Sequence, residues 1–195
     1  MPLTLTTLIG RSARLEPLTL AHAADLQVAA AEPELWRYMS FGSLAEPARL
    51  RSWIEALAAE RAGGTGHAFA IVDQASGRAV GSSSYFDYTE KDRWLEIGRT
   101  FLGKPYWRTA INTECKYLLL RHGFEVLGVN RIQLKTDLRN VRSQNAIARL
   151  GAVREGVLRA HVVMYDGYLR DTVMFSIIAP EWPAVKQRLE TMMVR

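Results

Sequence analysis

The segment Lys104–Phe124, KPYWRTAINTECKYLLLRHGF, joins two aromatic and two basic residues directly to an amphipathic helix. Thr109 is the expected N-cap of that helix, because its hydroxyl can accept a first-turn backbone N–H. A core-facing helix is predicted from a stripe with spacings of four, three and four residues, formed by Ile111, Cys115, Leu118 and His122. The short segment before the helix follows no such pattern.

Positive charge gathers at the start of this predicted helix. The first-turn N–H groups of a helix have no helical partner, and the macrodipole adds partial positive charge there. Lys104 and Arg108 lie immediately upstream. The stretch alone is equally compatible with an anion-binding site and with an ordinary capped helix preceded by solvated cations.

Length and charge narrow the class of protein. The chain of 195 residues is 48% hydrophobic, which predicts one folded domain spanning residues 1–195. Its net charge is +5 and its isoelectric point about 9.6. The cations are interleaved with acids, as in TEKDRWLEIGR (residues 89–99), which argues against a nucleic-acid partner. A modest positive field also suits a binder of small polyphosphates.

Cysteine and histidine give no metal site. Cys115 is the single cysteine, which excludes an intrachain disulfide and a CxxC zinc motif, and it is read as a small buried hydrophobe. No metal-ligand spacing links the four histidines, His22, His67, His122 and His161, which are read as structural. The N-terminal stretch MPLTLTTLIGRSARL lacks the pattern of a leader, and no apolar run is long enough to span a membrane. A cytoplasmic protein without a membrane partner is expected, as a monomer or homodimer.

Alternating and helical patterns mix along the chain without a repeat or a linker. Strands are predicted at residues 13–19, 67–73, 79–88, 93–102, 131–137, 154–164 and 169–178. Helices are predicted at residues 19–31, 46–64, 111–122, 141–151 and 180–192. The predicted fold class is therefore a single α/β domain of mixed order.

A series of motifs in a fixed order resembles one superfamily. The segments EIG, YW followed by NTE, RNVRSQ followed by RLGAVREG, RDTVMFS and EWP cover nearly the whole chain. Together they resemble the GNAT superfamily of acetyl-CoA N-acetyltransferases, in the branch of the ribosomal-protein N-terminal alanine and serine acetyltransferases. The resemblance implies a twisted, mixed but mostly antiparallel sheet flanked by helices. Its fourth and fifth strands would splay apart, with acetyl-CoA in the gap.

The resemblance also implies cofactor contacts, residue by residue. The backbone of residues 100–102 would bind the pantetheine arm as an added strand does. The segment 107–112 would surround the pyrophosphate, and a pantetheine-contacting asparagine with a small polar neighbour follows the next strand. The implied acetyl-CoA contacts are Thr100, Phe101, Leu102, Trp107, Arg108, Thr109, Ala110, Ile111, Asn112, Asn140 and Ser143.

Four positions depart from the family pattern. Arg108 and Ala110 stand where glycines are usual, and Asn112 stands where glycine or alanine is common. Arg108 could add a phosphate contact, whereas the methyl group of Ala110 could crowd one. Ile147 replaces the tyrosine that many relatives use as general acid to the leaving thiolate. Either another group donates that proton or the thiolate leaves without specific help.

Glu96 is the candidate catalytic residue. Its side chain is expected on the opposite sheet face from Leu95 and Ile97, and a carboxylate can deprotonate an amine directly or through water. The alternative is a structural ion pair with an arginine. The aromatic residues Trp36, Tyr38 and Phe41 either shape an acceptor groove or anchor the core.

The sequence is thus interpreted as an N-acetyltransferase that moves the acetyl group of acetyl-CoA to a primary amine. Transfer would be direct, in a ternary complex, without a metal. The acceptor could be the N-terminal α-amine of a ribosomal or other protein, or a small-molecule amine. The departures at Ala110 and Ile147 leave one alternative, that the protein is a CoA-binding regulatory module that has lost catalysis.

Overall fold

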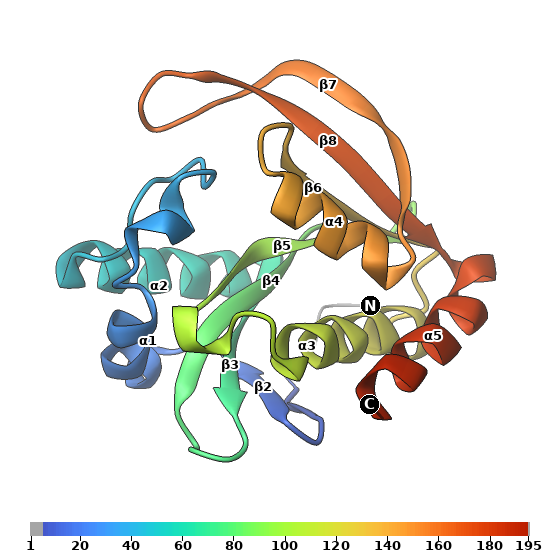
Figure 1. Ribbon diagram of the computed structural model, residues 1–195, viewed down its shortest axis with the longest axis horizontal. Coiled ribbons are helices and arrows are strands. Elements are labelled where there is room, and N and C mark those ends of the chain that lie inside the picture. The colour runs from blue at the N-terminus through green and yellow to red at the C-terminus, as the bar shows by residue number, and fades with distance from the viewer. Residues whose placement is uncertain (1–5, 195) are drawn as a thin grey trace.

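Within residues 6–194, eight strands form one mixed sheet in the spatial order β1-β2-β3-β4-β5-β6-β8-β7 (Figure 1). The computed structural model describes residues 6–194; residues 1–5, which belong to the stretch used above to argue against a leader, lie outside it. All neighbouring strands are antiparallel except β5 and β6. The strands are β1 Leu8–Ile9, β2 Ala13–Pro17, β3 Gly66–Asp73, β4 Ala79–Thr89, β5 Trp94–Leu102, β6 Arg131–Asp137, β7 Val153–Val163 and β8 Leu169–Ile178. The predicted mixed, mostly antiparallel sheet is confirmed.

Helices cover both faces of this sheet, with α1 and α2 on one face and α3, α4 and α5 on the other (Figure 1). The α-helices are α1 Ala23–Ala29, α2 Pro47–Ala62, α3 Ala110–Arg121, α4 Val141–Leu150 and α5 Trp182–Val194. Single turns of 3-10 helix are η1 Leu20–His22, η2 Pro33–Trp36, η3 Lys104–Tyr106 and η5 Ala179–Glu181, and η4 His122–Val126 is a π-helical turn. The five predicted helices are confirmed, although the first begins as a 3-10 turn.

Alternation along the central strands divides the core in two. In β3, Phe69 and Ile71 pack against α3, while Ala70 and Val72 pack with α1 and α2. Successive side chains of a strand point to opposite faces, so each strand supplies both layers. The two layers are therefore separate hydrophobic clusters on either side of one sheet.

The sheet opens between β5 and β6. These parallel strands pair over only three residues, and Glu96 opposite Gln133 is the last pair. β5 then continues to Leu102 and β6 to Asp137 without further pairing between them in the part of the chain that is described. This splay lies between the fourth and fifth strands predicted from the sequence, as expected. These strands are numbered β5 and β6 because the short strand β1 was not predicted.

A bulge reshapes β5 within the splay. The β4–β5 register shifts between Ser82 and Ser84, and Arg99 has a φ of 50°. An extra residue in one strand changes which face its neighbours meet. Consequently the Thr100 hydroxyl lies toward α3, while Phe101 belongs to the α1–α2 layer.

The N-terminal segment is attached to α3 by one carboxylate. The backbone N–H groups of Arg11, Ser12 and Ala13 all donate to Glu114, at 2.7, 2.6 and 2.7 Å. A Cβ at Gly10 would lie 2.6 Å from the Glu114 Cδ, so only glycine fits beside it. Glu114 thus holds the turn between β1 and β2 against α3.

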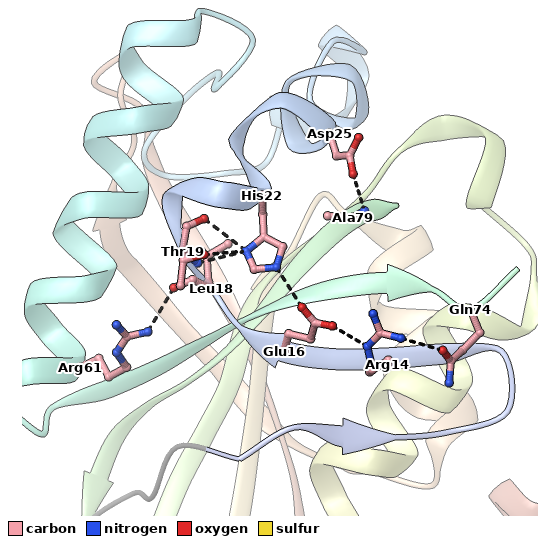
Figure 2. Close-up of polar contacts among 9 residues, drawn as sticks. All are labelled: Arg14, Glu16, Leu18, Thr19, His22, Asp25, Arg61, Gln74 and Ala79. Atoms are coloured by element: carbon pink, nitrogen blue, oxygen red, sulfur yellow. Dashed lines mark hydrogen bonds and ion pairs between the residues drawn. The ribbon is translucent and has the colours of Figure 1, made fainter. Parts of the chain in front are cut away.

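His22 (Figure 2) is one of the four histidines predicted to have a structural role. Its Nδ1 lies 3.2 Å from both the backbone nitrogen and the hydroxyl of Thr19, and its Nε2 lies 3.2 Å from a Glu16 oxygen. Within residues 6–194 no group of three or more His, Cys, Asp or Glu side chains could hold a metal ion. None of the helices described there is long and apolar enough to cross a membrane.

Candidate active site

The N-terminus of α3 has the predicted cap. The Thr109 hydroxyl accepts the backbone N–H of Ile111 at 3.4 Å. Arg108 precedes it with a φ of 62°, the left-handed region that glycine occupies most easily. Arg108, Thr109 and Ala110 are exposed, and Asn112 is half-buried. The backbone here therefore takes the course that glycine would favour, although the chain has arginine at that position.

The two cations upstream of α3 have different surroundings. The Lys104 ammonium lies 2.9 Å from a Glu32 carboxylate oxygen, which raises the pKa of Lys104 and lowers that of Glu32. Arg108 forms no ion pair with any described residue. Of the two cations upstream of α3, the charge of Lys104 is therefore already matched, whereas that of Arg108 is not.

Trp107 links the two sides of the splay. Its indole N–H donates to the Leu102 carbonyl at 2.7 Å, which fixes the ring against the end of β5. The guanidinium carbon of Arg142, on α4, lies 4.3 Å from the centre of the indole ring. Arg142 also forms an ion pair with Glu34, with 3.5 Å between Nη1 and Oε1. A cation over an aromatic face is attractive, so α4 and the start of α3 are held together here.

Asn140 and Ser143 lie at the start of α4, on the β6 side of the splay. The Asn140 Oδ1 accepts the Ser143 backbone N–H at 3.0 Å, which caps the helix. The side-chain amide nitrogen of Asn140 has no hydrogen-bond partner among the described residues. Its donor hydrogens are therefore available to a ligand while its oxygen is not.

Two hollows flank these elements. A pocket of about 250 Å³ lies at the start of α4, and its walls include Tyr38 and Asn140. A second, of about 480 Å³, opens beside the N-terminus of α3 and is lined by Arg11, Ser12, Asp73, Gln74, Ala75, Thr109, Ala110 and Ile111. Of the three segments predicted to hold the cofactor, the one at residues 107–112 and the one at the start of α4 therefore border open space.

Glu96 lies at the vertex of the splay and is 1% exposed. Lys135 Nζ and Gln133 Nε2 contact its Oε2 at 2.9 and 2.8 Å, while Oε1 makes no hydrogen bond with any described residue. Burial raises the pKa of Glu96, and the Lys135 ammonium opposes that rise. The ion pair considered from the sequence exists, but with a lysine, and it leaves one carboxylate oxygen unengaged.

The three aromatic residues before α2 divide between the two roles. Trp36 is buried, donates its indole N–H to the Ala30 carbonyl at 2.9 Å and packs on Phe101. Phe41 packs beside it at the edge of the same layer. Tyr38 instead lines the smaller pocket, so it alone of the three borders open space there.

The tip of the β7–β8 hairpin approaches the segment between α1 and α2. Tyr165 lies within 3.1 Å of the position where a Cβ on Gly42 would be. The Arg139 guanidinium stacks on Tyr168 at 3.7 Å and forms a 2.7 Å ion pair with Asp137. The tip of the long hairpin (Figure 1) thus lies against the segment between α1 and α2.

Sequence reasoning missed a buried cation on the other face. Lys116, on α3, is 7% exposed and donates to the hydroxyls of Ser83 and Thr100. Its place four residues before Leu120 could have indicated a buried position. Ile147 packs in the core cluster of the same face and carries no proton to donate.

The fold and sequence agree with one family. A model for the acetyltransferase (GNAT) domain matches residues 13–153. The uncharacterized N-acetyltransferase p20 of Bacillus licheniformis is 26% identical over 151 residues, which are 77% of this chain and 84% of p20. A GCN5-related N-acetyltransferase from Brucella melitensis superposes with a TM-score of 0.91 and 28% identity, over 97% of this chain and 86% of that one.

A third comparison concerns the fold alone. Mycobacterium smegmatis RimJ, solved in complex with CoA-disulfide, has a TM-score of 0.78 at 24% identity, over 92% of this chain and 88% of RimJ. The match to the domain model defines the class: the fold is that of an acyltransferase. The chain belongs to the GNAT acetyltransferase family, whose members use acetyl-CoA.

Proposed function

We propose that the protein transfers the acetyl group of acetyl-CoA directly to a primary amine, in a ternary complex. The observation that carries this proposal is the separation of β5 from β6 immediately after Glu96. It leaves the backbone of residues 97–102 without a strand on that edge, where a pantetheine arm can add as a peptide strand does. Thr100, Phe101 and Leu102 would be its contacts.

The phosphates would bind at the N-terminus of α3. Free first-turn N–H groups and the macrodipole favour an anion there, and Arg108 supplies an unmatched charge. The segment from Trp107 to Asn112 borders this position. Across the splay, the free amide hydrogens of Asn140, with Ser143 beside it, would hold the pantetheine.

Glu96 would act as the base. An amine must be neutral to attack a thioester, and an α-amine has a pKa near 8, so it needs to lose one proton. Oε1 of Glu96 is free to accept that proton, directly or through a water molecule, while Oε2 stays fixed by Lys135 and Gln133. Proton removal and attack would both occur at the vertex of the splay.

No covalent enzyme intermediate is proposed. Cys115 is fully buried, and burial raises the pKa of its thiol to about 11. A thiolate, not a thiol, is the nucleophile in thioester exchange. The amine would therefore attack the bound thioester itself.

The acceptor we favour is the N-terminal α-amine of a protein, ribosomal proteins included, in the cytoplasm. The pocket of about 250 Å³ beside Tyr38, at the start of α4, would admit the end of a chain. A small-molecule amine would also fit a hollow of about 250 Å³.

An acceptor panel tests the proposal. Purified protein and acetyl-CoA are incubated with peptides that begin with alanine or serine, with the same peptides blocked at the N-terminus, and with spermidine. Thiol release and the mass of the products are followed. We expect acetylation of the free-N-terminus peptides and none of their blocked counterparts. Turnover with spermidine alone would replace the protein acceptor by a small amine, and no turnover with any amine would contradict the proposed transfer.

A further inference from the structure

Lys116 is a buried cation without a counter-charge. Its side chain runs from α3 toward the sheet, and Nζ donates to Ser83 Oγ at 3.1 Å and to Thr100 Oγ1 at 2.5 Å. No ion pair with a carboxylate forms within residues 6–194. Burying an ammonium group is costly unless an anion compensates, so this position needs a reason beyond packing.

The groups that hydrogen-bond Lys116 within residues 6–194 carry no negative charge. On α3, the thiol of Cys115 is the titratable group that interacts electrostatically with Lys116. Burial raises the pKa of this thiol to about 11, so it is uncharged at neutral pH. From β4 and β5, the facing groups are the hydroxyls of Ser83 and Thr100. The adjacent Glu114 carboxylate is bound to the backbone of residues 11–13. Burial is the main cause that lowers the pKa of Lys116.

The Thr100 hydroxyl connects this cation to the splay. Thr100 is half-buried on β5, past the three residues that pair with β6. Its Oγ1 also lies 2.8 Å from Ser83 Oγ. Lys116 and Ser83 can both donate to Thr100 Oγ1. The Thr100 hydroxyl then has one protein acceptor for its own proton, the Gly98 carbonyl oxygen, which lies 3.4 Å from Oγ1, at the outer limit of a hydrogen bond. A ligand beside β5 would be a better acceptor.

We propose that Lys116, acting through the Thr100 hydroxyl, supplies the proton that the leaving thiolate of CoA takes up; this rests on the acetyl transfer proposed above. As the C–S bond breaks, its electron pair goes to sulfur, and sulfur takes the Thr100 proton. Thr100 Oγ1 takes a proton from the Lys116 ammonium in the same step. Glu96 takes up the two protons that the acceptor amine loses, one before attack and one from the tetrahedral intermediate, and passes each to water. Lys116 is reprotonated from water after the products depart.

This assignment gives the two sheet faces complementary roles. Glu96 lies on the face of β5 opposite Leu95 and Ile97, while Lys116 and Thr100 Oγ1 lie on the α3 face. Ile147, which has no exchangeable proton, is in the core of that second face. Proton removal from the amine and proton delivery to sulfur are thus separated by the strand along which the thioester is proposed to lie.

Four variants test the relay with acetyl-CoA and the fastest acceptor of the panel. Lys116→Met and Thr100→Val should each lower kcat roughly a hundredfold while the KM for acetyl-CoA changes less than about threefold, because only proton delivery is lost. Thr100→Ser retains the hydroxyl and should restore most of the rate. Ser83→Ala is the matched control, because it removes the other hydroxyl bound to Lys116. It should lower kcat by less than about threefold. Equal losses at Ser83 and Thr100 would overturn the relay, because they would indicate a structural role for both.

The pH profile separates proton transfer from charge alone. The wild-type kcat should fall at high pH as Lys116 loses its proton, and Thr100→Val should lack that fall. Lys116→Arg keeps the charge but holds its proton too tightly, so it should be as slow as Lys116→Met. An active Lys116→Arg enzyme, or a basic limb retained in Thr100→Val, would overturn the proposal. Because every comparison is made against an active wild-type enzyme, these results are distinct from a failure of acetyl transfer itself.

Discussion

Two buried charges lie on opposite faces of β5 and are treated differently by the fold. Glu96 is matched by the Lys135 ammonium and the Gln133 amide, as a structural carboxylate would be. Lys116 has only the hydroxyls of Ser83 and Thr100. A matched pair can be explained by the sheet alone, whereas an unmatched cation cannot.

Burial and charge are common to Glu96 and Lys116, so neither property distinguishes a structural from a catalytic group. The two side chains differ in what remains unsatisfied, which is one oxygen of Glu96 and the whole charge of Lys116.

His67 provides a third case, a buried base with no partner at all. It is 2% exposed, and neither ring nitrogen has a hydrogen-bond partner in the described chain. Burial, aided by the charges of Arg61 and His122, lowers its pKa from 6.5 to about 4. The unfolded chain therefore binds a proton below pH 6.5 that the folded protein refuses until about pH 4.

This titration predicts a loss of stability in acid. Because the pKa of His67 is depressed in the folded state, its titration should lower the free energy of unfolding by about 3 kcal/mol as the pH falls from 7 to 4. Urea unfolding of the wild type and of His67→Phe at several pH values measures it. The variant should lose less stability in acid; parallel curves would show that His67 is not the group responsible.

Glu96→Gln tests the matched charge. The amide retains the size of the side chain but cannot accept a proton, so turnover should fall roughly a hundredfold, equivalent to about 2.7 kcal/mol. The residual rate should climb with pH as the acceptor amine loses its own proton, and the affinity for acetyl-CoA should hardly change. Thiol release across a pH series provides the measurement.

Lys135→Gln is the control for the structural alternative. It removes the partner of Glu96 and leaves the carboxylate buried, so the melting temperature should fall while proton acceptance survives. If Glu96 only holds the sheet together, both variants should lose stability and keep the wild-type pH–rate profile. A stable Glu96→Gln protein with full turnover would exclude the catalytic role.

The smallest expected effect concerns the exposed cation at the start of α3. Arg108 has a φ of 62°, and glycine there should raise the free energy of unfolding by up to about 1 kcal/mol. The same change removes the unmatched charge, so acetyl-CoA should bind several-fold more weakly. Urea unfolding and calorimetry measure the two effects, and Arg108→Asn, which tolerates this φ, isolates the charge. Unchanged affinity in both variants would remove Arg108 from the phosphate contacts.

Local patterns predicted much of the fold. The strand at residues 131–137 and the helix closed by Gly151 were predicted with their observed bounds, because alternation, capping and a left-handed glycine are local signals. β1 escaped prediction because two residues show no alternation. The separation of β5 from β6 came from the family resemblance, since a gap between strands has no local signature.

The candidate site was less predictable from the sequence. Glu96 was selected by its strand position, but its lysine partner is distant in the chain. Lys104 lies just upstream of α3 in the sequence, and only the folded arrangement reveals Glu32 beside it. Lys116 follows Cys115 in the same helix, and whether its ammonium meets water or two hydroxyls depends on how α3 lies on β4 and β5.

The N-terminus of α3 is proposed to bind the phosphates of acetyl-CoA beside the splay. This is tested by calorimetric titration of the purified protein with acetyl-CoA and with acetyl-pantetheine, which lacks those phosphates. Charge-assisted hydrogen bonds to the phosphates should make acetyl-CoA bind at least about tenfold more tightly. Equal affinity for the two ligands would contradict the claim, because the helix terminus and Arg108 would then contribute nothing to binding.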